Sequence, residues 1–295
     1  SGPYTSSHRP RESLPMQRFL VVEFTKMNGA GNDFVVLDNR FYAFSEAELA
    51  ALARDLCRRT ERVGADGLLA IDHGEDGADF RMHYHNADGS RSTMCGNGAR
   101  CLARFARSAD LGTPGAPLVF DTDAGRLHAE VPDDLAADVR LHLPPPRDLR
   151  PLTLGGLEAT DVWTGTEHVV RFVRHTAAVD LATAGPALRH DPALAPRGAN
   201  VNLVEVLDAD RLRVRTYEKG VEAETRACGT GAMASALVAF HCGRVSRTPV
   251  AVEMPGGTLT VGFNWTPGAP AEAVTDLTLA GPAEVTFRGT VEIAV

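Results

Sequence analysis

The sequence predicts an α+β fold made of two similar halves, in each of which strands surround one long helix. The motif Cys-Gly-x-Gly-Ala occurs twice, at residues 95–99 and 228–232, and each copy follows strand-like segments and opens a helical one. Each half also contains a strand that starts at an asparagine, Asn32 in the first and Asn200 in the second. A chain of 295 residues is long enough for two domains of ordinary size.

The first half is expected to hold seven short strands and two helices. Ser45 and Glu48 form a capping box, which predicts a helix from there to about Arg59. The second helix follows Cys95 and extends to about residue 109. Compact apolar or alternating runs predict strands at residues 19–24, 34–37, 67–71, 80–86, 118–122, 125–131 and 139–143.

Three consecutive prolines, Pro144 to Pro146, mark a linker, since proline cannot donate to a strand ladder. Beyond it, strands are expected within 158–173, broken around 165–168, and then at 200–206 and 212–216. Residues 181–189 form a short helix candidate interrupted by Pro186. The helix 229–241 is apolar on nearly every face and is therefore expected to be buried. A loop over 218–226 leads to Cys228, and strand-like segments fill 250–295.

Composition excludes several classes of protein. A net charge of −8 argues against a nucleic-acid or anionic-membrane surface. No apolar run approaches the roughly 20 residues of a membrane span. Arg100, Arg104 and Arg107 recur at helical spacing, which favours a solvated helix face over a phosphate site. Residues 1–15 are polar and without a signal-like apolar core, so we interpret them as a disordered leader or expression remnant, with Met16 as the natural start.

The five cysteines are too scattered for a disulfide framework, and none has the C-x-x-C spacing of a zinc ribbon, so no metal site and a reducing cytoplasm are expected. A cysteine at a helix N-terminus lies near free N–H groups and the positive dipole end, which should lower the thiol pKa. The adjacent glycines would let a ligand carboxylate approach those N–H groups.

Three chemistries compete with a purely structural role for Cys95 and Cys228, a role that is commoner for either motif taken alone. Nucleophilic catalysis could use His168 as its base but leaves the second cysteine without a task. Thiol–disulfide chemistry, or a redox-responsive anion-binding protein, would use both sulfurs without needing carboxylate pockets for turnover. Two-base proton transfer at a carbon uses the whole pattern, with one thiolate and one thiol on opposite faces of the substrate.

Four motifs in order resemble those of diaminopimelate epimerases: residues 24–34 (Phe-Thr-Lys-Met-Asn-Gly-Ala-Gly-Asn-Asp-Phe), 86–90 (Asn-Ala-Asp-Gly-Ser), 94–101 (Met-Cys-Gly-Asn-Gly-Ala-Arg-Cys) and 227–232 (Ala-Cys-Gly-Thr-Gly-Ala). The resemblance runs from about Phe19 to the C-terminus. It implies a cofactor-independent isomerase that converts LL- to meso-diaminopimelate on the route to lysine and peptidoglycan, and commonly a homodimer. It also implies two pseudo-symmetric domains, each a strongly curved, mainly antiparallel sheet or barrel around a central helix.

The same resemblance implies a division into residues 16–139 with 283–295, which carry Cys95, and residues 140–282, which carry Cys228. It implies that these two cysteines are the acid/base pair and that His168 and Glu218 assist them. The implied substrate contacts are Asn32, Asn86, Gly96, Asn97, Thr166, Asn200, Lys219, Gly229 and Thr230.

The sequence departs from the family pattern where the distal end of the substrate would bind. The usual Gly-Asn-Pro-His is Gly-Thr-Glu-His at 165–168, the usual Glu-Arg is Glu218-Lys219, and the following segment is one residue longer. A lysine replaces a planar bidentate donor by a point charge. These changes leave open a related racemase or epimerase, independent of pyridoxal phosphate, with altered distal specificity.

Overall fold

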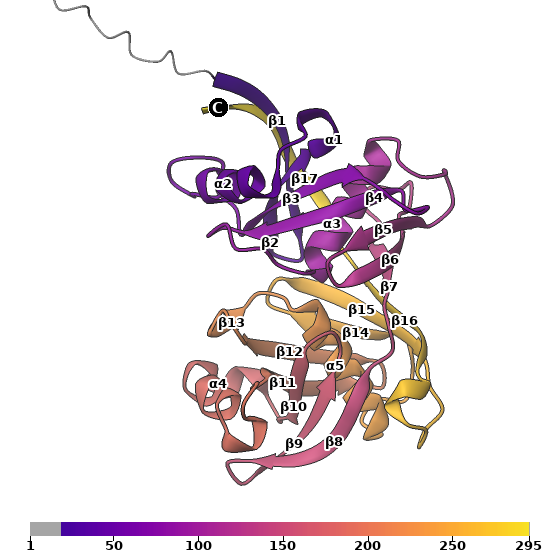
Figure 1. The fold of residues 1–295 in the computed structure, drawn as a ribbon. Helices are drawn as coiled ribbons and strands as arrows, with labels where there is room; N and C mark the ends of the chain where they lie inside the picture. The colour runs from indigo at the N-terminus through magenta and orange to yellow at the C-terminus, as the bar shows by residue number, and fades with distance from the viewer. Residues whose placement is uncertain (1–18, 295) are drawn as a thin grey trace, which may run out of the picture.

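The computed structural model describes residues 19–294, which form two halves stacked one above the other, each around a long helix (Figure 1). The predicted leader, residues 1–15, lies outside the described residues. The first half contains β1 (Phe19–Gly29), β2 (Asn32–Asp38), α1 (Asn39–Tyr42), α2 (Glu46–Leu56), β3 (Gly67–His73), β4 (Phe80–Asn86), α3 (Gly96–Ser108), β5 (Leu118–Thr122), β6 (Gly125–Glu130), β7 (Val139–His142) and, from the chain's end, β17 (Glu284–Ala294).

The second half contains β8 (Arg147–Leu154), β9 (Leu157–Trp163), β10 (Glu167–Phe172), α4 (Leu181–Arg189), β11 (Asn200–Asp208), β12 (Arg211–Glu218), β13 (Ala223–Thr225), α5 (Gly229–His241), β14 (Val250–Met254), β15 (Gly257–Asn264) and β16 (Thr275–Gly281). The elements predicted from the sequence are confirmed, apart from their ends: α2 stops at Leu56 rather than near Arg59. Three elements were missed, namely α1, β8 immediately after the prolines, and β13 inside the expected loop.

Strand pairing shows that the halves share one plan. From β1 to β7 the successive pairings are antiparallel, parallel, antiparallel, parallel, antiparallel and antiparallel. The order β9, β10, β11, β12, β14, β15, β16 repeats that sequence of pairings. A helix fills each parallel crossover, α2 and α3 in the first half and α4 and α5 in the second, as parallel neighbours require.

Each sheet is covered on both faces because its central strands are apolar on both sides. In β2, Phe34 and Val36 pack against α3, whereas Val35 and Leu37 pack against α2. In the second half, Val204 of β11 faces α5. Buried residues on the opposite face of β11 join α4 in a separate core. The sheets therefore curve around α3 and α5, and α2 and α4 lie outside them.

The two central helices differ in polarity, and here one prediction is wrong. Helix α5 is apolar all round and is buried, as predicted. Arg100 and Arg104 of α3, however, are 0% and 4% exposed rather than on a solvated face. Arg104 donates to the carbonyl oxygens of Pro132 and Asp134, in the loop before β7. The guanidinium is therefore hydrogen-bonded by backbone carbonyl groups of this loop, which covers the helix, rather than by water.

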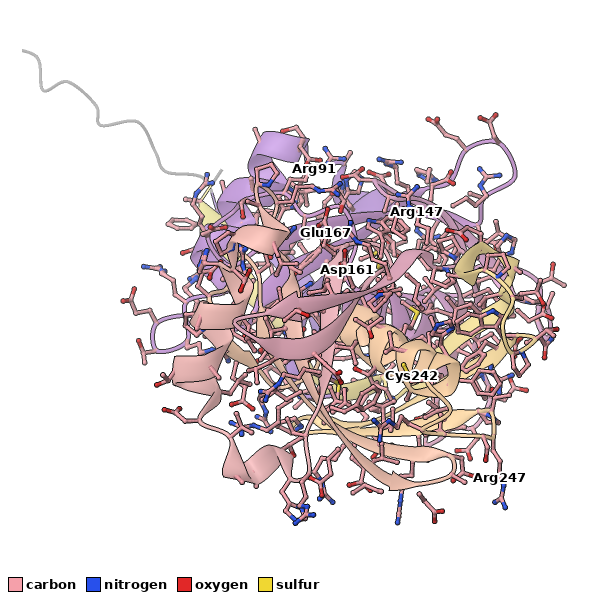
Figure 2. The ribbon with its side chains drawn as sticks, turned by 90° about the horizontal axis from the view of Figure 1, so that it is seen from below. Arg91, Arg147, Asp161, Glu167, Cys242 and Arg247 are labelled. Carbon is pink, nitrogen blue, oxygen red and sulfur yellow. The ribbon has the colours of Figure 1, made fainter. Side chains whose placement is uncertain are left out.

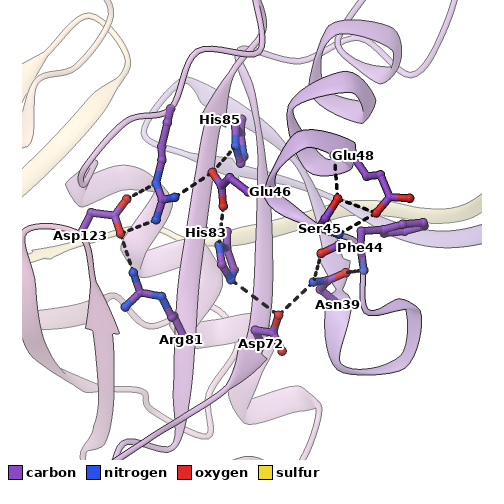
Figure 3. Close-up of polar contacts among 11 residues, drawn as sticks. Asn39, Phe44, Ser45, Glu46, Glu48, Asp72, Arg81, His83, His85 and Asp123 are labelled. Carbon is purple, nitrogen blue, oxygen red and sulfur yellow. Dashed lines mark hydrogen bonds and ion pairs between the residues drawn. The ribbon is translucent and has the colours of Figure 1, made fainter.

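A polar cluster fastens α2 to the sheet (Figure 3). Glu46, in the first turn of α2, lies 2.7 Å from Nε2 of the buried His85 and 3.3 Å from Nδ1 of His83, both on β4. Its carboxylate also pairs with Arg91 at 3.1 Å. A carboxylate is favourable at a helix N-terminus. The cluster therefore has a structural role, since it holds the start of α2 against β4.

Apart from the contacts between their central helices, the halves are joined along strands and at one pair of turns. Strand β7 pairs with β16, and β17 returns from the second half to pair with β1 over most of its length (Figure 1). The turn at Ala30 also meets the turn at Gly256, where a Cβ atom would lie 2.1 Å from the Ala30 carbonyl oxygen. Among the described residues, no helix is long and apolar enough to cross a membrane.

Candidate active site

The two motif cysteines are the N-cap residues of the two central helices, and these helix ends face each other. Cys95 and Cys228 both have extended backbone, with φ of −137° and −130°, before α3 and α5 begin. A Cβ atom added to Gly229 would lie 3.9 Å from the Cα atom of Gly96 and 2.8 Å from a methyl group of Leu279. Glycine at 229 leaves room for this methyl group where the two helix ends approach each other. Two sets of free N–H groups therefore converge on one region.

Cys228 is held by the first turn of its own helix. The N–H of Gly231 donates to its sulfur at 3.4 Å, and the hydroxyl of Thr230 lies 3.5 Å from the same atom. The Cys228 side chain is 7% exposed, whereas Cys95 is half-buried. Both are free thiols.

The expectation that the helix ends lower both thiol pKa values is wrong for this structure. Burial raises the pKa of Cys228 to about 12, and it also raises that of Cys95. The backbone N–H groups at the two helix ends, that of Gly98 near Cys95 and that of Gly231 at Cys228, oppose this rise without cancelling it. A thiolate loses more hydration on burial than a few N–H groups restore. Burial therefore disfavours the thiolate form at both sulfurs, and any group that favours a thiolate there must act against it.

Glu218, at the end of β12, is the charged group common to both sulfurs. Its carboxylate adds to the rise in the pKa of Cys95 and of Cys228 beyond what burial causes. Burial raises its own pKa, and no ion pair to it is found among the residues that the structure describes. A carboxylate that is half-buried without a cation gains from a ligand that supplies one. Glu218 thus has the position and charge to bind an ammonium group between the two thiols.

His168 is fully buried at the start of β10 and reaches Cys228 through Thr230. Its Nε2 lies 2.9 Å from the Thr230 hydroxyl, and its Nδ1 faces the Asn202 amide nitrogen at 3.0 Å. The Asn202 amide oxygen accepts from Thr216, so its nitrogen is the donor toward Nδ1. This 3.0 Å contact outweighs the 3.4 Å contact between Nε2 and the Asn200 amide nitrogen, and we assign the ring proton to Nε2. Burial, with the Lys219 charge next, lowers the pKa of His168 to about 3. The ring is therefore a neutral hydrogen-bond donor rather than a base for Cys228.

Asn32 and Asn97 join the first half to the second beside Cys95. The Asn97 amide nitrogen lies 3.3 Å from the Asn32 amide oxygen and 3.5 Å from the carbonyl oxygen of Ala227, the residue before Cys228. The Cys95 sulfur lies 3.9 Å from the same Asn32 oxygen. These contacts bring together two of the predicted binding residues and both thiol-bearing segments.

Asn86 and Asn200 have protein partners of their own. Asn86 donates to the Ser90 hydroxyl at 3.0 Å, inside the predicted turn. Its neighbour Ala87 donates to the carbonyl oxygen of Asp66, whose carboxylate accepts from Asn32 at 2.6 Å. Asn86 is thus linked to the site through Asp66 rather than by direct contact with it.

Asn200 fixes the chain around the predicted distal contacts. Its side chain accepts from the Lys219 N–H at 2.7 Å and donates to the Glu167 carbonyl oxygen at 3.3 Å. The Lys219 ammonium lies 2.6 Å from the Glu167 carboxylate, and Thr166 donates to that carboxylate at 3.2 Å. Thr166 and Lys219, both predicted to bind substrate, therefore meet at Glu167, which the prediction omitted.

The sequence reasoning missed three residues, Glu167 among them, and the sequence patterns that could have revealed them differ. Asn202 follows Asn200 by two positions on β11, and this spacing places both side chains on one face of a strand. A Cβ at Gly231 would lie 2.5 Å from the Asn202 oxygen, which explains the second glycine of that motif. Glu167 was recognised only as a departure from a family pattern. Arg100 carried no signal, since arginines at helical spacing usually face water.

The chain is similar to known proteins over most of its length. A sequence model of the family described as diaminopimelate epimerase matches residues 24–146 and 161–267. A diaminopimelate epimerase of Chlorobaculum tepidum is 42% identical over 269 residues, covering 90% of this chain and 100% of that protein. One of Aquifex aeolicus is 38% identical, covering 91% of this chain and 97% of that protein.

Solved structures resemble the whole fold. A phenazine-biosynthesis protein of the PhzF family from Bacillus anthracis has a TM-score of 0.70 at 16% identity, covering 92% of this chain and 99% of that one. A hydroxyproline epimerase of Agrobacterium vitis has a TM-score of 0.65 at 16% identity, covering 95% of this chain and 93% of that one. At such identity the likeness shows the fold alone, and it confirms the predicted fold class of two halves around central helices.

Proposed function

Because this chain belongs to the diaminopimelate epimerase family, we propose that it is an isomerase that converts LL- to meso-diaminopimelate by proton transfer between Cys95 and Cys228. The observation that supports this most is the placement of both cysteines at the N-caps of equivalent helices whose first residues face each other. Two thiols placed in this way can exchange protons with one carbon on its two opposite faces.

In the proposed reaction, the thiolate of one cysteine removes the α-proton, breaking the C–H bond and forming S–H. The thiol of the other cysteine then donates its proton to the opposite face, forming a new C–H bond and leaving a thiolate. The proton count of the pair is unchanged, and the carbon is inverted. Each thiol thus serves as acid or base according to the direction of the reaction.

Groups around the two thiols can stabilise the charges of the substrate and of the reacting carbon. The N-terminal N–H groups of α3 and α5, beginning at Gly96-Asn97 and Gly229-Thr230, can hold the α-carboxylate and the charge that forms beside it. Glu218 can bind the α-ammonium group, a cation that would also favour the neighbouring thiolate. The neutral His168 orients the Thr230 hydroxyl at Cys228.

The experiment that tests the reaction is incubation of reduced enzyme with LL-diaminopimelate in heavy water, without added cofactor. We expect meso-diaminopimelate carrying one deuterium at the inverted α-carbon. A redox-responsive anion-binding protein would bind the compound and exchange nothing. If neither inversion nor exchange occurs with both thiols reduced, the proposed reaction is wrong.

At the distal end we propose that Lys219 binds the second carboxylate of the substrate and Glu167 its second ammonium group. Lys219 and Glu167 already form an ion pair at 2.6 Å, and Arg197 lies 3.3 Å from the other oxygen of Glu167. An acid and a base side by side match the opposite charges of an amino-acid end group. Both lie near enough to His168 to affect its pKa, after burial, which places them beside the thiol site.

Replacing Lys219 by methionine is expected to raise the KM for diaminopimelate about tenfold, the effect of losing roughly 1.4 kcal/mol of a screened ion pair. Turnover of lysine, which lacks the distal carboxylate, should change little. Steady-state assays with both compounds measure this difference. Arg247→Met removes an exposed cation elsewhere on the surface (Figure 2) and should change neither value. Equal losses on both compounds would contradict a distal role and favour a related racemase with another substrate.

Three finer features complete the proposal. The enzyme would act in a reducing cytoplasm, because the reaction needs both sulfurs as free thiols. It would be a homodimer, as the resemblance to the family implies, which light scattering can test. The domains would divide as residues 16–139 with 283–295 and residues 140–282, in line with the return of β17 to β1. This boundary falls inside β7, the strand that pairs with β6 of one half and β16 of the other.

A further inference from the structure

Arg100 is a fully buried cation without a carboxylate partner among the described residues. Its side chain is 0% exposed, and its Nη1 atom has no hydrogen-bond partner. Its other contacts are to the amide oxygen of Asn97 at 2.8 Å and to the carbonyl oxygen of Pro282 at 3.4 Å. Burying a charge in this way is costly, and proteins usually compensate it with a counter-ion.

The groups that could compensate Arg100 are few. Those with an electrostatic effect on it are Cys101 and Cys95 on α3 and Asp138, which is exposed before β7. Burial raises the pKa of Cys101 to about 12, so that thiol stays neutral. The geometry places Cys95 at the end of α3 that the Arg100 head group reaches, since a Cβ atom at the next residue, Gly96, would lie 4.0 Å from the unpaired Nη1 atom. Cys95 is therefore the group at this end of the helix that we expect to carry the compensating charge. Around Cys95, the carboxylate of Glu218 on β12 opposes a negative charge. Burial raises the pKa of Tyr84 on β4 and of Cys228, so these two groups are neutral near neutral pH.

The two halves differ at this position. Arg100 is the fifth residue after Cys95, and the fifth residue after Cys228 is Met233, which is also buried. Both helices otherwise share Cys-Gly-x-Gly-Ala, so the two equivalent positions differ in charge, with a cation on α3 and a thioether on α5. Among the described residues, Arg100 lowers the pKa of Cys95 against the larger effects of burial and of Glu218, and no cation is among the main influences on the pKa of Cys228.

Arg100 also controls the link between the halves. By donating to the Asn97 oxygen, it leaves the Asn97 nitrogen to face Asn32 and the carbonyl oxygen of Ala227. Through Pro282 it contacts the segment where the chain returns from the second half to the first. One side chain therefore touches the amide beside Cys95 and the crossover between the halves.

We propose that Arg100 is a positioning residue that places the single negative charge of the thiol pair on Cys95 in the resting enzyme and holds Asn97 between the two halves. This proposal rests on the proposed function, because it assigns unequal starting roles to its two thiols. In the resting enzyme Cys95 is the base and Cys228 the acid, and the opposite arrangement forms after one turnover.

The test is the rate of carbamidomethylation of each thiol by iodoacetamide, followed by mass spectrometry of the Cys95 and Cys228 peptides across pH. In the native enzyme the midpoint of the pH dependence should be lower for Cys95 than for Cys228. Midpoints, unlike rates, do not depend on how accessible each sulfur is. The reverse order would overturn the proposal, whether or not the protein proves to epimerise diaminopimelate.

Arg100→Met should raise the Cys95 midpoint by about one pH unit or more and move that of Cys228 less, as loss of a nearby opposite charge predicts. Arg100→Lys should retain most of the native value. The acidic limb of the kcat/KM profile should rise with the Cys95 midpoint. Arg104→Met, which removes a buried guanidinium one turn further along α3, should move neither midpoint. Equal shifts at both thiols, or none, would contradict the role given to Arg100; if Arg100→Met does not fold, the native order of midpoints decides.

Discussion

Replacing either Cys95 or Cys228 by alanine is expected to reduce epimerisation by about 10³-fold or more, since a positioned acid or base contributes roughly 10² to 10⁴ in rate. Each variant removes one of two groups that must act on opposite faces of the carbon. The neighbouring side chains cannot replace it, because His168 is held neutral and Thr230 is not an acid near neutral pH. Steady-state conversion of LL- to meso-diaminopimelate by reduced enzyme measures the loss.

The single variants should keep part of the reaction. With Cys228 replaced, Cys95 can still remove and return a proton on its own face. Deuterium from heavy water should then enter one stereoisomer without inversion, and Cys95→Ala should show the opposite stereoisomer preference. Cys242→Ala is the matched control, because Cys242 is an exposed thiol at the far end of α5 (Figure 2). Activity within a few-fold of native in either active-site variant would exclude the two-base reaction.

Much of this architecture follows from patterns that local physics enforces. The strand β4 was predicted with its correct ends because alternation and an Asx-type turn agree there. Helix α5 was predicted with its correct start because Cys-Gly-x-Gly-Ala precedes a long apolar segment. The duplicated motif also indicated duplicated halves, which the repeated order of parallel and antiparallel pairings confirms.

The features that the sequence did not reveal depend on which residues become buried in the folded protein. The rule that helix ends lower thiol pKa values was applied without the burial that reverses it at Cys228. Arg100 and Arg104 looked like surface residues because helical spacing alone cannot tell a helix at a protein's edge from one wrapped by a sheet. Glu167 was known only as an unusual residue, since its pairing with Lys219 joins positions 52 residues apart.

Replacing Glu218 by glutamine is expected to lower kcat/KM for diaminopimelate by about 10²-fold or more, because breaking a buried ion pair by removing one partner is strongly unfavourable. In the free enzyme this carboxylate has no cation among the described residues, so the pair forms with the substrate's ammonium group. The variant keeps the size of the side chain and one acceptor oxygen, and replaces the other oxygen by an NH₂ donor. Steady-state assays across pH measure both the loss and the shape of the profile.

The pH profile of kcat/KM gives a second, independent test of the role of Glu218. Burial raises the pKa of Cys95 and Cys228, and the negative charge of Glu218 adds to that rise. Removing the charge must lower both thiol pKa values, so the acidic limb, where the base loses its proton, should move to lower pH. The basic limb, where the acid loses its proton, should move the same way. Glu222→Gln changes an exposed carboxylate that pairs with Arg189, and should leave both limbs in place.

These two effects of Glu218 act in opposite directions at low pH, which separates its roles. If the carboxylate acted solely by repelling thiolates, Glu218→Gln would make the enzyme faster on the acidic side of the native optimum. If it acted solely by binding the ammonium group, activity would fall equally at every pH and the limbs would stay in place. Because Glu218 is half-buried and its charge acts on both sulfurs, we expect a lower profile that is also displaced toward acid. An unchanged profile at full activity would place the substrate's ammonium group elsewhere.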